Sequence, residues 1–469
     1  MVLLRLNEIQ ALSQVHFIVM KENVNNTKYK YEQIKQSGLD FLNITPDDIF
    51  PLIQKLFSDQ DKNSKFYDIA QVGNSFQKKP IYKITSGNGP VNLFLWSQMH
   101  GNESTATASL FDLINYIRHP ENKDWFDSWS EKLTLHIVPM LNPDGAKLVQ
   151  RVNAQGIDIN RDAKALQSPE GRLLLSLAEE IKPQFGFNLH SQNRFYTVGE
   201  TSNSAIISLL APAYNDAKET NESRKKAKQL VSIINKAIHQ QYPNHVGRYD
   251  DTYSYRSFGD LFSAKGISTI LIEAGFCKND QQRQIPRWLT FLGLIESITA
   301  IRDKSYSKEP LATELLDDYD TIPFNTEDGQ ADLLLKNISI DHSYCVDISI
   351  NYDDEYKNGK IDAIGDLSTI TGLSTIDTQQ SKVHALKSFE LKDAFNLSDD
   401  KYAELLKQGV GYFIGDSSLL TIDTELPVIV NPGTDNISNW SKPEKLANFI
   451  LSQNEKKNLA IINGVAIKL

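Results

Sequence analysis

A strongly apolar run that leads into a histidine and a glutamate constrains the fold of this chain more than any other stretch. Residues 91–96 read Val-Asn-Leu-Phe-Leu-Trp, a pattern typical of a buried strand in an α/β sheet. His100-Gly-Asn-Glu103 follows, and the pattern of residues 104–116 then predicts a helix. We therefore expect His100 and Glu103 on a loop at the carboxyl end of a strand, where open α/β sheets bind their ligands.

An imidazole and a carboxylate are two of the ligand types that a catalytic zinc ion accepts. Such a site also requires a third protein ligand and one open position. Taken alone, a His-x-x-Glu pair occurs by chance in many chains, so this pair does not establish a metal site. Whether other ionisable residues reach the same edge of the sheet decides between the two interpretations.

Two further predicted strands also end in ionisable residues. Residues 184–190 form an apolar run that ends in His190, and residues 267–274 form another that ends in Glu273 and Ala274. A carboxylate in a buried strand is costly unless it has a partner, so Glu273 indicates a site rather than a core. By contrast, His136 lies inside the predicted strand 133–140, and we interpret it as structural.

The segment 151–162 carries two arginines and two asparagines, and Gly156 interrupts it. This composition favours neither a helix nor a strand. The planar guanidinium of arginine matches a carboxylate and also stabilises an oxyanion, so the segment is a candidate substrate-binding loop. A solvated loop with ordinary surface arginines is the alternative interpretation of the segment by itself.

Together these motifs resemble the carboxypeptidase A-like zinc metallocarboxypeptidases, the funnelins. The similarity runs from about Phe66 to Arg302, and its details are closer to the bacterial branches of the family than to the digestive enzymes. The resemblance implies an α/β fold in which helices flank a mixed, twisted sheet. The motifs that carry it are, in chain order, His100-x-x-Glu103, Asn142-Pro-Asp-Gly145, Arg151, Gly156-Ile-Asp158-Ile-Asn160-Arg161, His190 and Ile272-Glu273-Ala-Gly275.

The resemblance implies one zinc ion per chain, ligated by His100, Glu103 and His190. Asp158 matches the aspartate that accepts the remaining ring N–H of His100, which would fix the tautomer of that ligand. Glu273 matches the general base that takes a proton from the zinc-bound water. Because zinc lowers the pKa of that water towards about 7, an ordinary carboxylate can then abstract the proton near neutrality.

The resemblance also implies a substrate with a free terminal carboxylate. Arg151 matches the arginine that stabilises the oxyanion of the tetrahedral intermediate. Asn160 and Arg161 match the pair that binds the terminal carboxylate of the substrate, which is why such an enzyme trims chain ends. The expected function is therefore that of a metallocarboxypeptidase, a zinc-dependent hydrolase of C-terminal peptide bonds.

A mobile tyrosine covers the substrate in this family, and three residues compete for that role here. Tyr249 is our choice, and Tyr253 and Tyr255 are the alternatives. The same loop, residues 250–256, offers both signs of charge, so it does not indicate a preference for one substrate side chain.

The sequence pattern divides the chain into segments of different expected structure. We expect a helical N-terminal extension over 1–65, a catalytic domain over 66–304 and a polar linker over 305–330. Residues 331–469 show short alternating strands separated by turns, which predicts a smaller, mainly β domain. One helix is expected at residues 398–407, with Ser398 as its N-terminal cap.

Composition excludes several classes of partner. A net charge of −10 over 469 residues argues against nucleic acid or an anionic membrane as the main partner. The two cysteines exclude a disulfide framework and a thiolate-rich metal site. The N-terminus lacks a signal-like apolar run, so the chain as written is expected in the cytoplasm, or in the periplasm or outside the cell if a leader was removed.

Two other functions remain open at this point. A zinc amidase or deacylase of the same fold would keep the ligands, the Asn-Arg pair and the base, while acting on an acylated amino acid or a cell-wall γ-glutamyl bond. A non-catalytic peptide-binding module is the second alternative. The presence of every ligand and of Glu273 argues against it.

Overall fold

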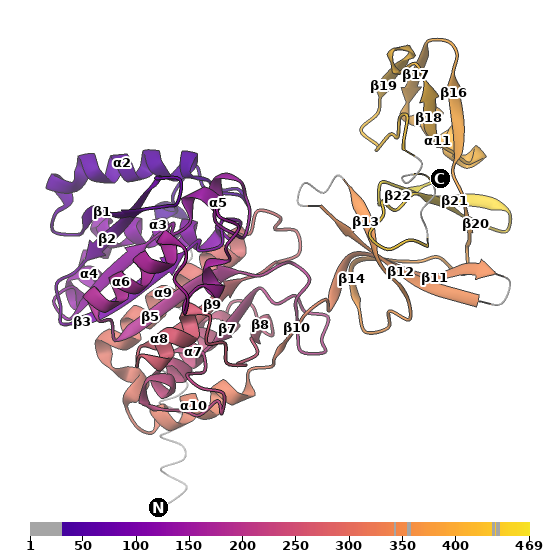
Figure 1. Ribbon diagram of the computed structural model, residues 1–469. Coiled ribbons are helices and arrows are strands. Elements are labelled where there is room, and N and C mark those ends of the chain that lie inside the picture. Colours follow the sequence, from indigo (N-terminus) through magenta and orange to yellow (C-terminus); the bar gives the residue numbers. More distant parts are fainter. Residues whose placement is uncertain (1–30, 342–343, 354–357, 434–436, 438–440) are drawn as a thin grey trace, which may run out of the picture. The chain divides into compact units, whose positions relative to one another are not determined.

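The computed structural model describes residues 31–469 apart from 342–343, 354–357, 434–436 and 438–440 (Figure 1). The chain divides into two compact units, Met1–Thr326 and Glu327–Leu469. The predicted N-terminal extension lies partly outside the described residues. Its described part contains helix α2 (Pro46–Asn63). Thr45 is the N-terminal cap residue of this helix and forms a reciprocal capping box with Asp48.

One eight-stranded mixed sheet organises the larger unit. Its four central strands run parallel, and antiparallel strands flank them, which confirms the predicted α/β class with a mixed sheet. The strands lie in the order β1 (Asp68–Asn74), β2 (Pro80–Ser86), β4 (Leu133–Val138), β3 (Val91–Ser97), β5 (Phe185–Ser191), β9 (Ser268–Ala274), β7 (Ile207–Leu210) and β8 (Val246–Arg248).

Helices cover both faces of this sheet, because alternate residues of each central strand point to opposite sides. On β3, Leu93 and Leu95 join the larger core, while Phe94 and Trp96 join the smaller one. The larger core includes side chains of α3 (Thr105–Arg118), α4 (Lys123–Trp129), α7 (Glu222–His239) and α9 (Gln284–Asp303), and the smaller core includes those of α6 (Pro169–Ile181) and α8 (Phe258–Ala264).

A buried ion pair fastens the segment before α2 to the helices of the larger core. Arg287 on α9 donates to both carboxylate oxygens of Asp112 on α3, at 2.7 and 2.8 Å. The same guanidinium donates to the carbonyl oxygens of Gln36 and Leu39, and the hydroxyl of Tyr31 donates to Asp112. The side chains of Asp112 and Arg287 are almost fully buried, and four apolar side chains of this segment belong to the larger core, namely Tyr31, Ile34, Leu39 and Ile44.

The segment expected as a linker, 305–330, contains the helix α10 (Leu311–Thr321). Its Ala312, Leu315 and Tyr319 are buried, at a spacing that places them on one face of the helix. On α7, Gln229 and Ser232 donate to carbonyl oxygens of α10. The acidic residues that made the segment resemble a linker belong to the remaining faces of an amphipathic helix.

The smaller unit consists mainly of strands, as predicted from its alternating pattern. It contains an eight-stranded sheet, two separate two-stranded sheets and two apolar clusters. Its strands are β11 (Gln330–Asp341), β12 (Tyr344–Tyr352), β13 (Gly359–Gly365), β14 (Thr371–Asp377), β15 (Lys382–His384), β16 (Lys387–Leu391), β17 (Phe395–Ser398), β18 (Val410–Gly415), β19 (Leu420–Asp423), β20 (Phe449–Gln453), β21 (Lys456–Ile462) and β22 (Val465–Lys468).

The helix predicted at 398–407 is α11 (Asp399–Gln408), and Ser398 is its N-terminal cap residue. The helix ends at Gly409, whose φ of +96° is a conformation that favours glycine. Val430 forms an isolated β-bridge with Phe413. Among the helices described, none is long and apolar enough to cross a membrane.

Candidate active site

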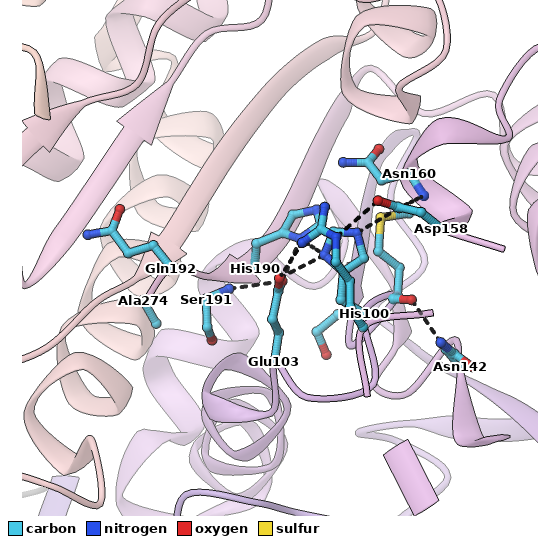
Figure 2. A network of polar contacts seen from close by, with 12 residues as sticks. His100, Glu103, Asn142, Asp158, Asn160, His190, Ser191, Gln192 and Ala274 are labelled. Atoms are coloured by element: carbon cyan, nitrogen blue, oxygen red, sulfur yellow. Dashed lines mark hydrogen bonds and ion pairs between the residues drawn. The ribbon is translucent and has the colours of Figure 1, made fainter. Parts of the chain in front are cut away.

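Two strand ends bring the predicted metal ligands together (Figure 2). His100 and Glu103 lie on the loop between β3 and α3, and His190 lies near the end of β5, which pairs with β3. The three side chains offer ligand atoms that lie within 4.8 Å of one another, and all three are buried. Among the described residues, this is the one cluster of histidine, cysteine and carboxylate groups arranged to hold a metal ion.

The ligand atoms converge on a small volume. The Nδ1 atoms of His100 and His190 are 3.1 Å apart, and the carboxylate oxygens of Glu103 lie 2.8 and 2.7 Å from them. Two imidazole nitrogens and a carboxylate form a donor set that catalytic zinc accepts. These residues therefore fit a metal ion, because a single cation can satisfy all the converging lone pairs.

Asp158 determines which ring nitrogen of His100 can face the cluster. Its Oδ1 lies 3.0 Å from Nε2 of His100, on the far side of the ring from Glu103. A carboxylate at that distance favours a proton on Nε2, which leaves the lone pair of Nδ1 available for a metal. The backbone N–H of Asn160 donates to the same Oδ1, which helps to hold the carboxylate in place.

Charge in the cluster is concentrated on Glu103. Burial raises the pKa of its carboxyl group, but His100 and His190 lower it by more, so the net pKa lies well below its usual range. The pKa of His190 is lowered, chiefly by burial. Burial also acts to lower the pKa of His100, but Glu103 and Asp158 raise it by more, so the net pKa of His100 is raised. An ionised Glu103 beside an unprotonated His190 is the protonation state in which a metal ligand set binds a cation.

Glu273 lies beside the cluster on the neighbouring strand β9. It is paired with His190 across the parallel ladder, so both side chains project from the same face of the sheet. Burial raises the pKa of Glu273 well above its ordinary value, and the negative charge of Glu103 adds to this effect. Its Oε2 is buried and has no hydrogen-bond partner within the described part of the chain, which leaves this oxygen available to a water or a substrate.

Arg151 reaches the cluster from the loop before Asp158. Its Nη1 donates to Oε1 of Glu103 at 3.2 Å, and its Nε donates to Oδ2 of Asp158 at 3.0 Å. The side chain is 45% exposed, so the guanidinium combines contact with the cluster and access to solvent. A cation in this position can stabilise negative charge that develops on a substrate oxygen.

Asn160 and Arg161 lie in a single 3₁₀ turn, Ile159–Arg161, directly after Asp158. Oδ1 of Asn160 accepts the backbone N–H of Phe258 at the start of α8, which fixes the amide between the two elements. Arg161 is exposed, and its Nη1 donates to the carbonyl oxygen of Asn160. The structure therefore links Asn160 to the metal cluster through Asp158, and no described contact joins the side chain of Arg161 to His100, Glu103 or His190.

The three candidate tyrosines lie in the loop after β8. Tyr249 packs against Tyr196, with ring centroids 5.6 Å apart, while Tyr253 is half-buried. Tyr255 is 55% exposed, and Nζ of Lys164 lies 4.8 Å from its ring centroid. The three residues remain competing candidates for a role that requires movement towards a substrate.

Asp251 anchors this loop rather than offering its charge to a ligand. Its Oδ2 accepts from the buried guanidinium of Arg224 on α7, and its Oδ1 lies 2.9 Å from Nζ of Lys218. The adjacent Asp250 is exposed. Its Oδ1 lies 3.5 Å from Nζ of Lys218, so both acidic residues of the loop take part in ion pairs.

Sequence reasoning missed the backbone groups that complete the site. The N–H of Ser191 donates to Oε2 of Glu103 at 3.1 Å, which no residue type could have signalled. Nη1 of Arg283 donates to the carbonyl oxygens of Gln192 and Ala274, and so joins the ends of β5 and β9. Arg283 lies outside every motif considered, so no pattern indicated it.

The Asn-Pro-Asp-Gly motif begins the short helix α5 (Pro143–Lys147). Asn142 caps this helix by accepting the N–H of Gly145, and its amide donates to the carbonyl oxygen of Met99, next to His100. Gly145 is required by close packing, because a Cβ there would lie 2.4 Å from the carbonyl oxygen of Val152. The motif therefore positions the loops that carry His100 and Arg151.

Known proteins with similar sequences include several carboxypeptidases. A family profile described as zinc carboxypeptidase matches residues 53–287. Carboxypeptidase SOL1 of Arabidopsis thaliana is 27% identical over 164 residues, which cover 31% of this chain and 33% of that protein. Gamma-D-glutamyl-L-diamino acid endopeptidase 1 of Lysinibacillus sphaericus is 33% identical over 84 residues, covering 17% of this chain and 21% of that protein.

Among solved structures, a metallo-carboxypeptidase from Pseudomonas aeruginosa aligns with a TM-score of 0.44 and 17% identity. The alignment covers 56% of this chain and 70% of that one. The matches to the first curated relatives span 33–38% of the length of those proteins.

Proposed function

Because this chain belongs to the zinc carboxypeptidase family, we propose that it is a zinc-dependent metallocarboxypeptidase that removes the C-terminal residue from peptides. The observation that carries the proposal is the convergence of His100, Glu103 and His190, with Glu273 projecting beside them from the next strand. A structural core would not bury this many ionisable groups together without a ligand to satisfy them.

The ligands proposed for zinc are Nδ1 of His100, the carboxylate of Glu103 and Nδ1 of His190. When bound there, zinc supplies Lewis-acid chemistry, since it acidifies water and polarises a carbonyl group. Asp158 holds His100 in the tautomer that a metal requires. The N–H of Ser191 and the guanidinium of Arg151 hold Glu103 in place from two sides.

The remaining residues act on the substrate. We propose that Glu273 accepts the proton of the attacking water and then delivers it to the leaving amine. Arg151 stabilises the negative oxygen of the tetrahedral intermediate. Asn160 and Arg161 bind the terminal carboxylate, which restricts cleavage to the last peptide bond.

One screen tests the proposal. Peptides with varied C-terminal residues are assayed as free acids and as C-terminal amides, with and without a chelator, alongside N-acyl amino acids. We expect hydrolysis of the free acids alone, lost on chelation and restored by zinc. Equal turnover of the amides would contradict the carboxypeptidase assignment, and activity that persists in a metal-free preparation would contradict the zinc site.

A zinc amidase or peptidase that cuts a γ-glutamyl bond of cell-wall peptides is the second candidate. The similarity to a γ-D-glutamyl-L-diamino acid endopeptidase over 84 residues favours it specifically. Such an enzyme would use the same ligands and the same base. In the screen it would hydrolyse γ-glutamyl peptides or N-acyl amino acids in preference to ordinary C-terminal peptide bonds.

A further inference from the structure

The loop that carries Arg151 and Asp158 closes around one fully buried side chain, that of Asn153. Oδ1 of Asn153 accepts the backbone N–H groups of Gln155 and Ile157, at 2.9 and 3.1 Å. Its backbone N–H donates to the carbonyl oxygen of Ile157 at 2.9 Å. Because two backbone N–H groups point at Oδ1, the orientation of the amide is determined by its neighbours.

The amide nitrogen of Asn153 is held by a second buried side chain from α6. Nδ2 donates to Oε2 of Glu170 at 2.9 Å, and Oε1 of Glu170 accepts the backbone N–H of Phe76 in the turn between β1 and β2. Both side chains have no exposed surface. Buried polar groups that satisfy one another in this way hold a single arrangement, because every alternative leaves a donor or an acceptor unpaired.

This closure determines where both ends of the loop lie. Arg151 and Asp158 are seven residues apart in sequence, yet the Arg151 guanidinium contacts the Asp158 carboxylate at 3.0 Å. Gly156 permits the turn between them through its φ of +75°. At the other end, the carbonyl oxygen of Arg151 accepts the N–H of Gly101 in the loop of the metal ligands.

We propose that Asn153, held by Glu170, is a positioning residue that places the Arg151 guanidinium and the Asp158 carboxylate against the metal cluster. The inference rests on the proposed function, because it assigns these two groups their roles in hydrolysis and in orienting His100. Neither Asn153 nor Glu170 touches the cluster itself. Their effect is transmitted through the backbone of residues 151–158.

The hydrogen bond between the two side chains can be broken and then rebuilt with its polarity reversed. N153D keeps the acceptor for Gln155 and Ile157 but places a second carboxylate against Glu170. E170Q places an amide group where the carboxylate accepts from Asn153 and from the N–H of Phe76, so one N–H donor is left without an acceptor. In the double variant N153D/E170Q, the amide introduced at position 170 can donate to the carboxylate introduced at position 153 and accept from the backbone of Phe76, with the total charge unchanged.

We expect kcat of N153D on a free-acid peptide to fall at least about tenfold, with KM changed less than about threefold, since Arg151 acts on the transition state. The zinc dissociation constant, measured by competition with a chromogenic chelator, should rise about tenfold through the displaced Asp158. E170Q should show the same changes to a smaller extent. The double variant should recover both quantities to within about threefold of the unmodified protein.

N122D is the matched control, because Asn122 is also buried but lies beyond the C-terminal end of α3, away from the metal loop. It should lower the melting temperature without moving kcat or the zinc dissociation constant. A double variant no better than N153D, or an N153D protein that matches the unmodified one in both readouts, would overturn the proposal. If the unmodified protein hydrolyses no substrate, the proposed function fails, while the zinc dissociation constants still decide the role of Asn153.

Discussion

The candidate site has two sides that differ in how firmly the fold holds them. On the metal side, His100, Glu103 and His190 are buried at the carboxyl ends of β3 and β5, where they contact one another. On the substrate side, Arg161 is exposed, and the candidate tyrosines lie in a loop between β8 and α8. The contrast indicates that the proposed metal ligands are held in place by the fold, whereas the proposed substrate-binding residues lie closer to the surface.

The largest effect is expected from removing the base on the metal side. Glu273→Gln preserves the size of the side chain and removes its ability to accept a proton, so kcat should fall by about 10² to 10⁴. Zinc content should stay at one ion per chain, because Glu273 is not among the proposed ligands. Steady-state kinetics and metal analysis check both statements, and a kcat within about threefold of the unmodified value would exclude Glu273 as the general base.

On the substrate side, Arg161→Ala should affect binding more than chemistry. Loss of a charge-assisted pair with the terminal carboxylate should raise KM for a free-acid peptide by about 10- to 100-fold. The zinc dissociation constant should not change. Arg172→Ala, at another exposed arginine on α6, is the control and should leave KM unaltered. A similar rise in KM in both variants would remove Arg161 from the site.

Substitutions of the three candidate tyrosines should have smaller effects on kcat/KM, and a comparison of them should show which tyrosine acts on the substrate. Tyr249→Phe removes one hydroxyl, so kcat/KM should fall by about 2- to 10-fold, the value of one hydrogen bond. Tyr253→Phe and Tyr255→Phe should each stay within about twofold of the unmodified protein. Parallel kinetics of the three variants make the test. A loss confined to the Tyr253 variant would transfer the role to that residue.

Substitution of His136, a histidine outside the metal cluster, is expected to affect the pH dependence of stability and not the kinetics. Burial lowers its pKa to about 4, so the folded state resists the proton that the unfolded chain accepts near pH 6.5. Its contribution to stability is therefore complete above pH 6.5 and decreases as the pH falls from 6.5 to 4, by up to about 2 kcal/mol after allowance for solvent screening of the partly exposed ring.

His136→Gln should reduce the decrease in unfolding free energy between pH 6.5 and pH 4, measured by urea denaturation at several pH values. Kinetic constants at neutral pH should stay the same, because His136 lies inside β4 and its Nε2 is near Asn92 rather than the cluster. An unchanged pH dependence of stability would show that this imidazole is protonated in the folded protein as readily as in the unfolded chain.

Sequence reasoning predicted the metal side well, because apolar runs mark buried strands and a charged residue at the end of such a run is conspicuous. The strands that carry His190 and Glu273 were placed within two residues of their observed bounds. The approach of Arg151 to Glu103 depended on family resemblance, since no period in the sequence relates two residues 48 positions apart.

The features that could not be predicted from the sequence are mainly hydrogen bonds made by polar side chains to the backbone of distant or neighbouring segments. The amide of Asn153 and the guanidinium of Arg283 act on backbone carbonyl or N–H groups, which every residue possesses and no pattern reveals. Likewise, the acidic composition of the segment 305–330 hid the apolar face of α10, because only three of its side chains are buried. Specific polar contacts between distant segments are the part of a fold that local patterns do not encode.

The Arg287–Asp112 pair has a consequence for the order in which this chain can fold during synthesis. Tyr31 and the carbonyl group of Gln36 leave the ribosome early, but the guanidinium that binds the Gln36 carbonyl comes 251 residues later. The Leu42 carbonyl and the Ile44 N–H, which bond with Ser104 beside Glu103, belong to the same early segment. The bonds from this segment to Ser104 need only the first 104 residues, whereas its bonds to Arg287 form only when the larger unit is almost fully synthesised.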